Sequence, residues 1–125
     1  MNTTALAFLG DAVYEVYVRR HVLEKEKVHV DRLHRLAVKY VCASGQARVV
    51  KQLLADDMLT EDEQALVKRA RNHRTASKPK NADPVVYKLA TAFEALLGFL
   101  HLSGQEQRLE EIVEQAFLIT EGKQP

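Results

Sequence analysis

Apolar residues recur along the chain at steps of three and four, the spacing of amphipathic helices. No stretch alternates apolar and polar residues with a period of two for long enough to indicate a strand. The pattern therefore predicts an all-α fold. A first helix is expected over residues 3–24, with an apolar face formed by Leu6, Leu9, Val13, Val16 and Tyr17.

Polar residues mark the expected ends of the next three helices. Asp31 is expected to cap the second helix and Ser44 the third, because short polar side chains accept hydrogen bonds from the free amides of a first turn. Thr60 followed by Glu63 has the form of a capping box, in which each side chain satisfies one such amide. A fourth helix should therefore begin at Thr60 and end near Asn72.

Another helix start occurs at Asp83, which precedes a proline. Proline is well tolerated at the first helical position, because the amide that it lacks would have no partner there. The helix from Pro84 to about Ser103 is apolar over most of its circumference, which favours a central, buried position. A last amphipathic helix is expected to carry Leu109, Ile112, Val113, Ala116 and Phe117.

Length and composition indicate one domain. The 125 residues fit a single unit over residues 1–125, and an apolar content of 46% suffices for a core without disulfides or structural metal. The amino-terminal apolar run follows no basic segment, and Asp11 ends it well short of the roughly 20 residues that span a bilayer. We expect a cytoplasmic protein with no membrane association. Cys42 is the single cysteine and is interpreted as a core residue.

Positive charge is concentrated between Gln64 and Ala82. This segment holds six Lys and Arg with no Asp or Glu, which leaves 12 Lys and Arg against 17 acids in the rest of the chain. Residues 73–83 also lack apolar periodicity and are expected to form an exposed basic loop. Such a segment indicates a site for a polyanion, although a solvated helix end and loop would have the same composition.

Two carboxylates lie in stretches that should otherwise be buried. Asp11 is the only charged residue within residues 5–13, and Glu94 is the only one within residues 89–100. A buried, ionised carboxylate is strongly unfavourable unless a cation, a metal or several hydrogen bonds compensate it. Each of these two acids should therefore have a partner.

Glycines lie close to both acids, with Gly10 before Asp11 and Gly98 one turn after Glu94. A glycine inside a helix costs about 0.5–1 kcal/mol relative to alanine, and close helix packing commonly explains it. Two helices packed through these glycines would bring the acids to one oxygen-rich point, which suits Mg²⁺ better than Zn²⁺. Alternatively, each acid pairs with an Arg or Lys, or one of them faces solvent.

Several other kinds of site have no signature in the sequence. His29 and His34 are five residues apart, so they do not share a helical face, and no HExxH or Cys/His cluster occurs. A zinc site is therefore not expected. The sequence also has no Gly-rich phosphate loop and no nucleophile elbow, which argues against an NTPase and a serine hydrolase.

Three ordered blocks of the sequence resemble the ribonuclease III family. Residues 8–13 (FLGDAV), followed by Glu15, are similar to its signature helix, and residues 93–98 (FEALLG) are similar to its second acidic helix. The closer resemblance is to Mini-ribonuclease III, the bacterial branch that has the catalytic domain and no double-stranded RNA-binding domain. It extends through residues 10–19, 66–72, 75–83 and 91–98.

This resemblance implies an all-helical endonuclease domain that dimerises through its signature helices. It also implies cleavage of both strands of double-stranded RNA with Mg²⁺, and a role in maturation of large-subunit ribosomal RNA. The catalytic and metal-binding acids fall on Asp11 and Glu94. Two further acids of ribonuclease III are replaced here by Ala7 and Thr91, which puts in doubt a two-ion site built from protein ligands alone. A metal-bound water should attack the phosphate in line and release a 3′-hydroxyl.

RNA contacts are expected in the basic segment. Duplex RNA is held mainly through phosphates and 2′-hydroxyls across its minor groove, so basic residues can bind it with little sequence preference. The candidate RNA-binding residues are Lys68, Arg69, Arg71, Asn72, Arg74, Lys78, Lys80 and Asn81.

Three alternatives stay open at this point. Glu15 either orients a water or metal ligand beside Asp11 or pairs with Arg19 one turn further along the helix. Loss of the acids at Ala7 and Thr91 gives some support to a non-catalytic RNA-binding or ribosome-associated protein of the same fold, whereas retention of Asp11 and Glu94 speaks against it. An unrelated helical interaction module is a further alternative, although it gives the basic segment no purpose.

Overall fold

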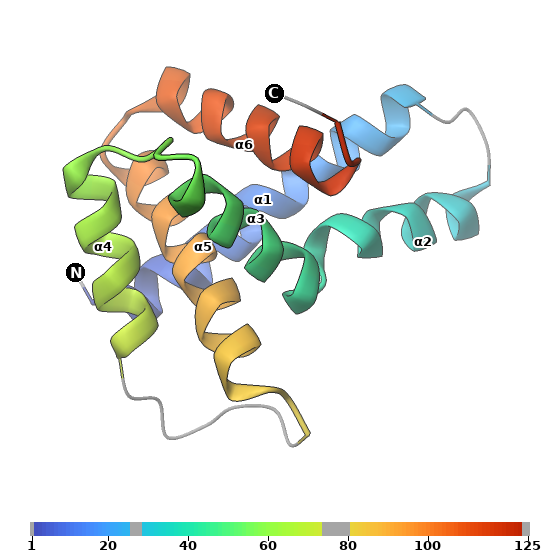
Figure 1. The fold of residues 1–125 in the computed structure, drawn as a ribbon. Helices are drawn as coiled ribbons and strands as arrows, with labels where there is room; N and C mark the ends of the chain where they lie inside the picture. Colours follow the sequence, from blue (N-terminus) through green and yellow to red (C-terminus); the bar gives the residue numbers. More distant parts are fainter. Residues whose placement is uncertain (1, 26–28, 74–80, 124–125) are drawn as a thin grey trace.

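The computed structural model describes residues 2–25, 29–73 and 81–123, and within these residues it has helices and no strands. The all-α prediction is therefore confirmed for the described part of the chain. The helices are α1 (Thr3–Lys25), α2 (Val30–Val41), α3 (Ala43–Ala55), α4 (Glu61–Asn72), α5 (Pro84–Leu102) and α6 (Glu106–Thr120). Helix α5 runs through the middle of the bundle, with α4 on one side and α3 on the other (Figure 1).

The structure confirms the two predicted helix starts that have capping side chains, those at Thr60 and Asp83. The Thr60 hydroxyl accepts a hydrogen bond from Glu63 N at 3.1 Å, and the Glu63 carboxylate accepts one from Thr60 N at 2.9 Å. Asp83 Oδ1 accepts hydrogen bonds from the amides of Val85 and Val86 at 2.8 and 3.3 Å. These caps fix the starts of α4 and α5 through contacts within a single turn.

The capping predictions for Asp31 and Ser44 are wrong. Helix α2 begins one residue earlier than Asp31, with no side-chain cap, and Asp31 lies in its first turn. Helix α3 begins at Ala43, before Ser44, because a single extended residue, Cys42, joins it to α2. The Cys42 amide donates to the carbonyl of Val38 at 3.0 Å, so backbone hydrogen bonding completes α2 without a side-chain cap.

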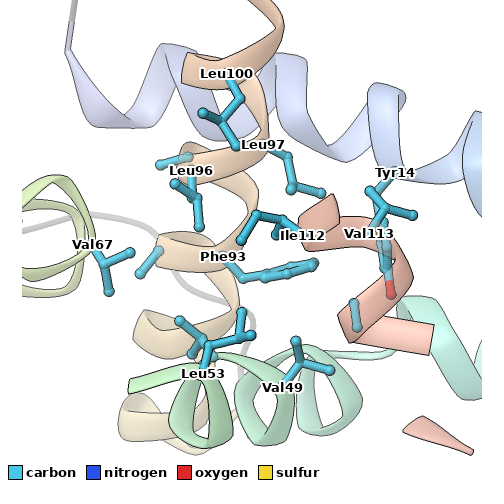
Figure 2. Packing of buried hydrophobic residues seen from close by; sticks show 14 of the residues in the cluster. Tyr14, Val49, Leu53, Val67, Phe93, Leu96, Leu97, Leu100, Ile112 and Val113 are labelled. Carbon is cyan, nitrogen blue, oxygen red and sulfur yellow. The ribbon is translucent and has the colours of Figure 1, made fainter. Parts of the chain in front are cut away.

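The core is centred on α5. Phe93 is fully buried and lies between side chains of α3 and α6, including Val49, Leu53 and Ile112 (Figure 2). The ring of Tyr14 on α1 meets Phe93 edge-on, with 5.0 Å between ring centroids. Helix α5 therefore connects α1, α3 and α6 through one continuous apolar cluster.

Helix α5 is the one helix among the described residues that is long and apolar enough to cross a membrane by length and composition. Half of this stretch is buried inside the fold. Its hydrophobicity is therefore accounted for by its central position in the core.

Helices α1 and α5 approach so closely that two glycines are required at their contact. A Cβ added to Gly10 would overlap the carbonyl oxygen of Glu94, and one added to Gly98 would overlap the carbonyl oxygen of Leu6. Both obstacles are backbone atoms, which no side-chain rotation can move. The glycines predicted to allow close packing are therefore located at this contact.

We predict that Gly10→Ala destabilises the protein by at least about 2 kcal/mol, because overpacking at a backbone contact outweighs the gain in helix propensity. Chemical denaturation of the two proteins measures the difference. Ala65→Ser, which also adds one heavy atom but lies on the exposed side of α4, is the control and should change stability little. Equal stability of Gly10→Ala and the wild type would show that α1 and α5 are not in backbone contact.

Candidate active site

The glycine contact brings Asp11 and Glu94 together. Asp11 directly follows Gly10, where an added Cβ would overlap the Glu94 backbone, and its side chain lies close enough to Glu94 to raise the pKa of that carboxyl. The sequence predicted both acids to be buried. Glu94 is partly buried, but Asp11 is exposed in the single chain, because the position after Gly10 lies beside the face that packs on α5.

The environment of Glu94 opposes its negative charge. Burial, a hydrogen bond with Asp11 and the charge of Asp11 raise the pKa of Glu94 from 4.5 to about 8, while a hydrogen bond from Gln46 acts in the opposite direction. Glu94 therefore holds a proton at neutral pH when no cation is present. No basic side chain among the described residues forms an ion pair with Asp11 or Glu94.

Other buried acids of the fold are paired differently. Glu63 receives Arg108 in a two-point ion pair at 2.8 and 2.9 Å, and these contacts outweigh burial and lower the pKa of Glu63. Glu121 is likewise surrounded by donors, so its pKa is lowered although burial alone would raise it. Its partners are His21, Lys25, Tyr40 and Lys123. Glu94 differs from Glu63 and Glu121, because no basic side chain among the described residues pairs with it.

Gln46 is a site residue that the sequence analysis missed. It lies on α3 with 2% of its surface exposed, and its side-chain amide contacts Glu94. The same face of α3 carries the fully buried Val49, Val50 and Leu53. In the sequence, Gln46 stands at helical spacing before these apolar residues. A polar residue on an otherwise apolar face was the signal that could have identified it.

The residues present fit Mg²⁺ better than Zn²⁺. Two adjacent carboxylates supply oxygen ligands, and the described residues contain no group of three or more His, Cys, Asp or Glu that could hold a metal. Magnesium ions typically retain several waters and share one or two protein carboxylates with substrate phosphates. Neither Ala7 nor Thr91 can add a carboxylate ligand, since Ala7 has a methyl side chain and the Thr91 side chain is a hydroxyl that donates to the Tyr87 carbonyl at 2.9 Å.

Glu15 lies one turn beyond Asp11 and contacts Arg19, whose Nε donates to Glu15 Oε2 at 3.0 Å. Arg19 is largely exposed, so this ion pair is weak. The observed contact favours the ion-pair interpretation of Glu15.

The predicted RNA-binding residues lie mainly on the last turns of α4 and near the start of α5. Lys68, Arg69, Arg71, Asn72 and Asn81 are all exposed. The carboxyl-terminal end of α4 and the amino-terminal end of α5 are on the same side of the molecule, the lower side in Figure 1. Three further candidates lie outside the described residues: Arg74, Lys78 and Lys80.

Comparison with known proteins agrees with this geometry. The ribonuclease III domain model matches residues 4–105. The Mini-ribonuclease 3 of Brevibacillus brevis is 50% identical over 122 residues, which cover 98% of this chain and 90% of that protein. That of Enterococcus faecalis is 44% identical over 113 residues, covering 90% and 86% of the two chains.

A crystal structure of a protein from Fusobacterium nucleatum has the same fold. It superposes with a TM-score of 0.81 at 30% sequence identity and covers 97% of this chain and 93% of its own. The matched domain spans both acidic helices and the glycine contact between them. The chain therefore belongs to the ribonuclease III family and is an endoribonuclease.

Proposed function

We propose that this chain is a magnesium-dependent endoribonuclease that cleaves double-stranded RNA at Asp11 and Glu94. The observation that carries the proposal is a partly buried carboxylate, Glu94, beside a second carboxylate and without a basic partner among the described residues. We further propose that it works in the cytoplasm as a homodimer of single-domain subunits over residues 1–125, without membrane association. The resemblance to Mini-ribonuclease III supports large-subunit ribosomal RNA precursors as the natural substrate.

The acidic residues have separate tasks in this proposal. Asp11 is exposed and can meet both an ion and the scissile phosphate, whereas Glu94 is held from behind by the core. Asp11 and Glu94 would hold Mg²⁺, which would supply a water of lowered pKa and neutralise phosphate charge, favouring in-line attack with a 3′-hydroxyl leaving group. Glu94 loses its proton when it becomes a ligand, because a ligating carboxylate must be ionised.

We predict that Asp11→Asn and Glu94→Gln each reduce cleavage of duplex RNA by at least a hundredfold, because each replaces a charged ligand with a neutral side chain of similar shape. Cleavage is measured by incubating each protein with duplex RNA in the presence and absence of Mg²⁺. A binding assay in Ca²⁺ measures the affinity of each variant for the RNA. Glu24→Gln, an exposed position on the same helix as Asp11, is the control and should cleave normally.

Two outcomes would contradict this assignment. Normal cleavage by either variant would exclude a two-carboxylate metal site. Binding of RNA without cleavage by the wild type would instead support the alternative of a non-catalytic RNA-binding protein.

The raised pKa of Glu94 predicts how metal-free stability depends on pH. Between pH 4.5 and about 8 the folded protein binds more protons than the unfolded chain, so the Glu94 contribution is full below pH 4.5 and is lost as the pH rises through 8. Glu94→Gln has no such loss. Its stability relative to the wild type should therefore increase from pH 5 to pH 9, by on the order of 2 kcal/mol.

Urea denaturation of the two proteins at both pH values, in EDTA, measures this difference. Glu24→Gln, at an exposed position on α1, serves as the control variant. A constant difference between Glu94→Gln and the wild type across this range would mean that Glu94 is ionised in the metal-free protein.

We propose that the basic residues of α4 and the segment after it bind the phosphates of duplex RNA. Lys68, Arg69 and Arg71 are exposed and carry no carboxylate partner among the described contacts. Asn72 and Asn81 flank the rest of the basic segment and can donate to phosphates or 2′-hydroxyls. Arg74, Lys78 and Lys80 are assigned to the same surface from the sequence alone.

Neutralising a phosphate contact should reduce the salt dependence of RNA binding. We predict that Arg71→Gln or Lys78→Gln lowers the slope of log affinity against log salt concentration by about one. The measurement uses Asp11→Asn protein, to prevent cleavage, across a salt series. Lys51→Gln, an exposed position on α3, should leave the slope unchanged. Unchanged slopes for both test variants would place the RNA elsewhere.

We propose that α1 forms the centre of a two-fold symmetric dimer. Phe8 is 84% exposed and Val16 58% exposed, which is unusual for large apolar side chains of one helix unless they meet a partner. A two-fold axis would also relate two active sites in the way that it relates the strands of a duplex.

Phe8→Ser should weaken the dimer at least tenfold, because it removes an apolar side chain from the subunit contact and not from the core. Sedimentation across a micromolar concentration range measures the dissociation constant. Val85→Ser, at a 60% exposed position on α5, is the matched control and should dimerise normally. A wild type that stays monomeric at tens of micromolar would contradict the dimer proposal.

A further inference from the structure

Gln46 is held in place by the corner between α2 and α3. Its backbone amide donates to the Cys42 carbonyl at 3.0 Å, and its side-chain Nε2 donates to the Val41 carbonyl at 3.2 Å. The corner itself is tight, since a Cβ on Gly45 would lie 2.8 Å from the Lys39 carbonyl oxygen. Both the backbone and the side-chain amide of Gln46 are therefore anchored to main-chain atoms.

The same amide reaches the active site. A glutamine side chain carries two N–H donors, and the Gln46 amide, which donates to the Val41 carbonyl, also lies close enough to Glu94 to lower the pKa of that carboxyl. Gln46 is 2% exposed, so it does not compete for these contacts by turning to solvent. The Gln46 side chain therefore lies between Glu94 and Val41, the last residue of α2.

A neutral donor suits a carboxylate that must bind a cation. Arg108 at Glu63 shows what a basic residue does in this fold, because it occupies both carboxylate oxygens. A lysine or arginine at position 46 would hold Glu94 in the same way and repel a metal ion. An apolar residue there would leave the carboxylate free to rotate. An amide orients the carboxylate without supplying charge.

We propose that Gln46 is a positioning residue that orients the Glu94 carboxylate for a divalent cation. This inference rests on the proposed function of Asp11 and Glu94. It extends the active site to α3 and to the corner at Cys42, which lie outside both acidic helices. Gln46 acts through Glu94 and is not assigned a contact with RNA.

Calorimetric titration of RNA-free protein with MnCl₂ tests the proposal. Gln46→Leu, which keeps the size of the side chain and removes its donors, should weaken Mn²⁺ binding about tenfold, as typical for loss of a group that orients a metal ligand. Gln52→Leu is the matched control on the exposed face of α3, where the side-chain amide donates to Asp56 at 2.8 Å. It should bind Mn²⁺ normally.

Cleavage provides a second readout. For Gln46→Leu, the Mg²⁺ concentration that gives half-maximal cleavage should rise by a similar factor, and excess Mg²⁺ should restore most of kcat with KM for RNA unchanged. Excess Mg²⁺ should not rescue Glu94→Gln.

A spectroscopic measurement needs no variant of Gln46 and stays informative if Gln46→Leu fails to fold. The side-chain amide resonances of Gln46 should shift when MgCl₂ is added to the wild type, and should not respond in Glu94→Gln. Those of Gln52 should not respond in either protein. Absence of the wild-type Gln46 shift, or Mn²⁺ affinity of Gln46→Leu equal to that of Gln52→Leu, would overturn the proposal. Normal Mn²⁺ binding by Asp11→Asn and Glu94→Gln would instead overturn the proposed metal site itself.

Discussion

Backbone contact between α1 and α5 at Gly10 and Gly98 is the constraint on which the rest of the structure depends. A side chain at either position would overlap a carbonyl oxygen of the opposite helix. The contact places Asp11 next to the turn of α5 that carries Glu94, so helix packing and the assembly of the acid pair are one event. The loss of helix propensity at two glycines, about 0.5–1 kcal/mol each, is therefore linked directly to the candidate active site.

Electrostatics distinguishes this acid pair from the other buried carboxylates. The fold can neutralise a buried acid effectively, as Arg108 does for Glu63 and a cluster of donors does for Glu121. At Glu94 it supplies a second acid and a neutral amide instead. Under the proposed function, a divalent cation would supply the positive charge that this pair lacks. A strongly raised pKa of this kind is common at functional sites.

The sequence predicted those features that depend on neighbouring residues. Caps at Thr60 and Asp83 act within one turn, so their residue types were sufficient. The end of α2 could not be predicted in this way, because Cys42 breaks the helix through its backbone conformation and offers no capping side chain. Asp31 and Ser44 have the right chemistry for caps, but the chain had already become helical before each of them.

The candidate site was predictable in part for the same reason. Isolated acids beside glycines indicated that two helices meet, and the structure brings Asp11 and Glu94 together as expected. Asp11 is exposed because it lies one residue after Gly10, and each residue of a helix points in a different direction from the one before it. The apolar periodicity did not define the packed face of α1 precisely enough to predict this. Gln46 was missed because its role depends on packing between α3 and α5, which brings it close to Glu94, 48 residues further along the sequence.

The most direct test of a metal site created by the glycine contact is a crystal structure of the protein grown with MnCl₂, with the ion located by its anomalous scattering. We predict one Mn²⁺ per subunit coordinated by oxygens of both Asp11 and Glu94, with Gln46 still donating to Glu94. Mn²⁺ bound elsewhere, or a basic side chain from the same or a second subunit paired with Glu94 in its place, would contradict the metal site.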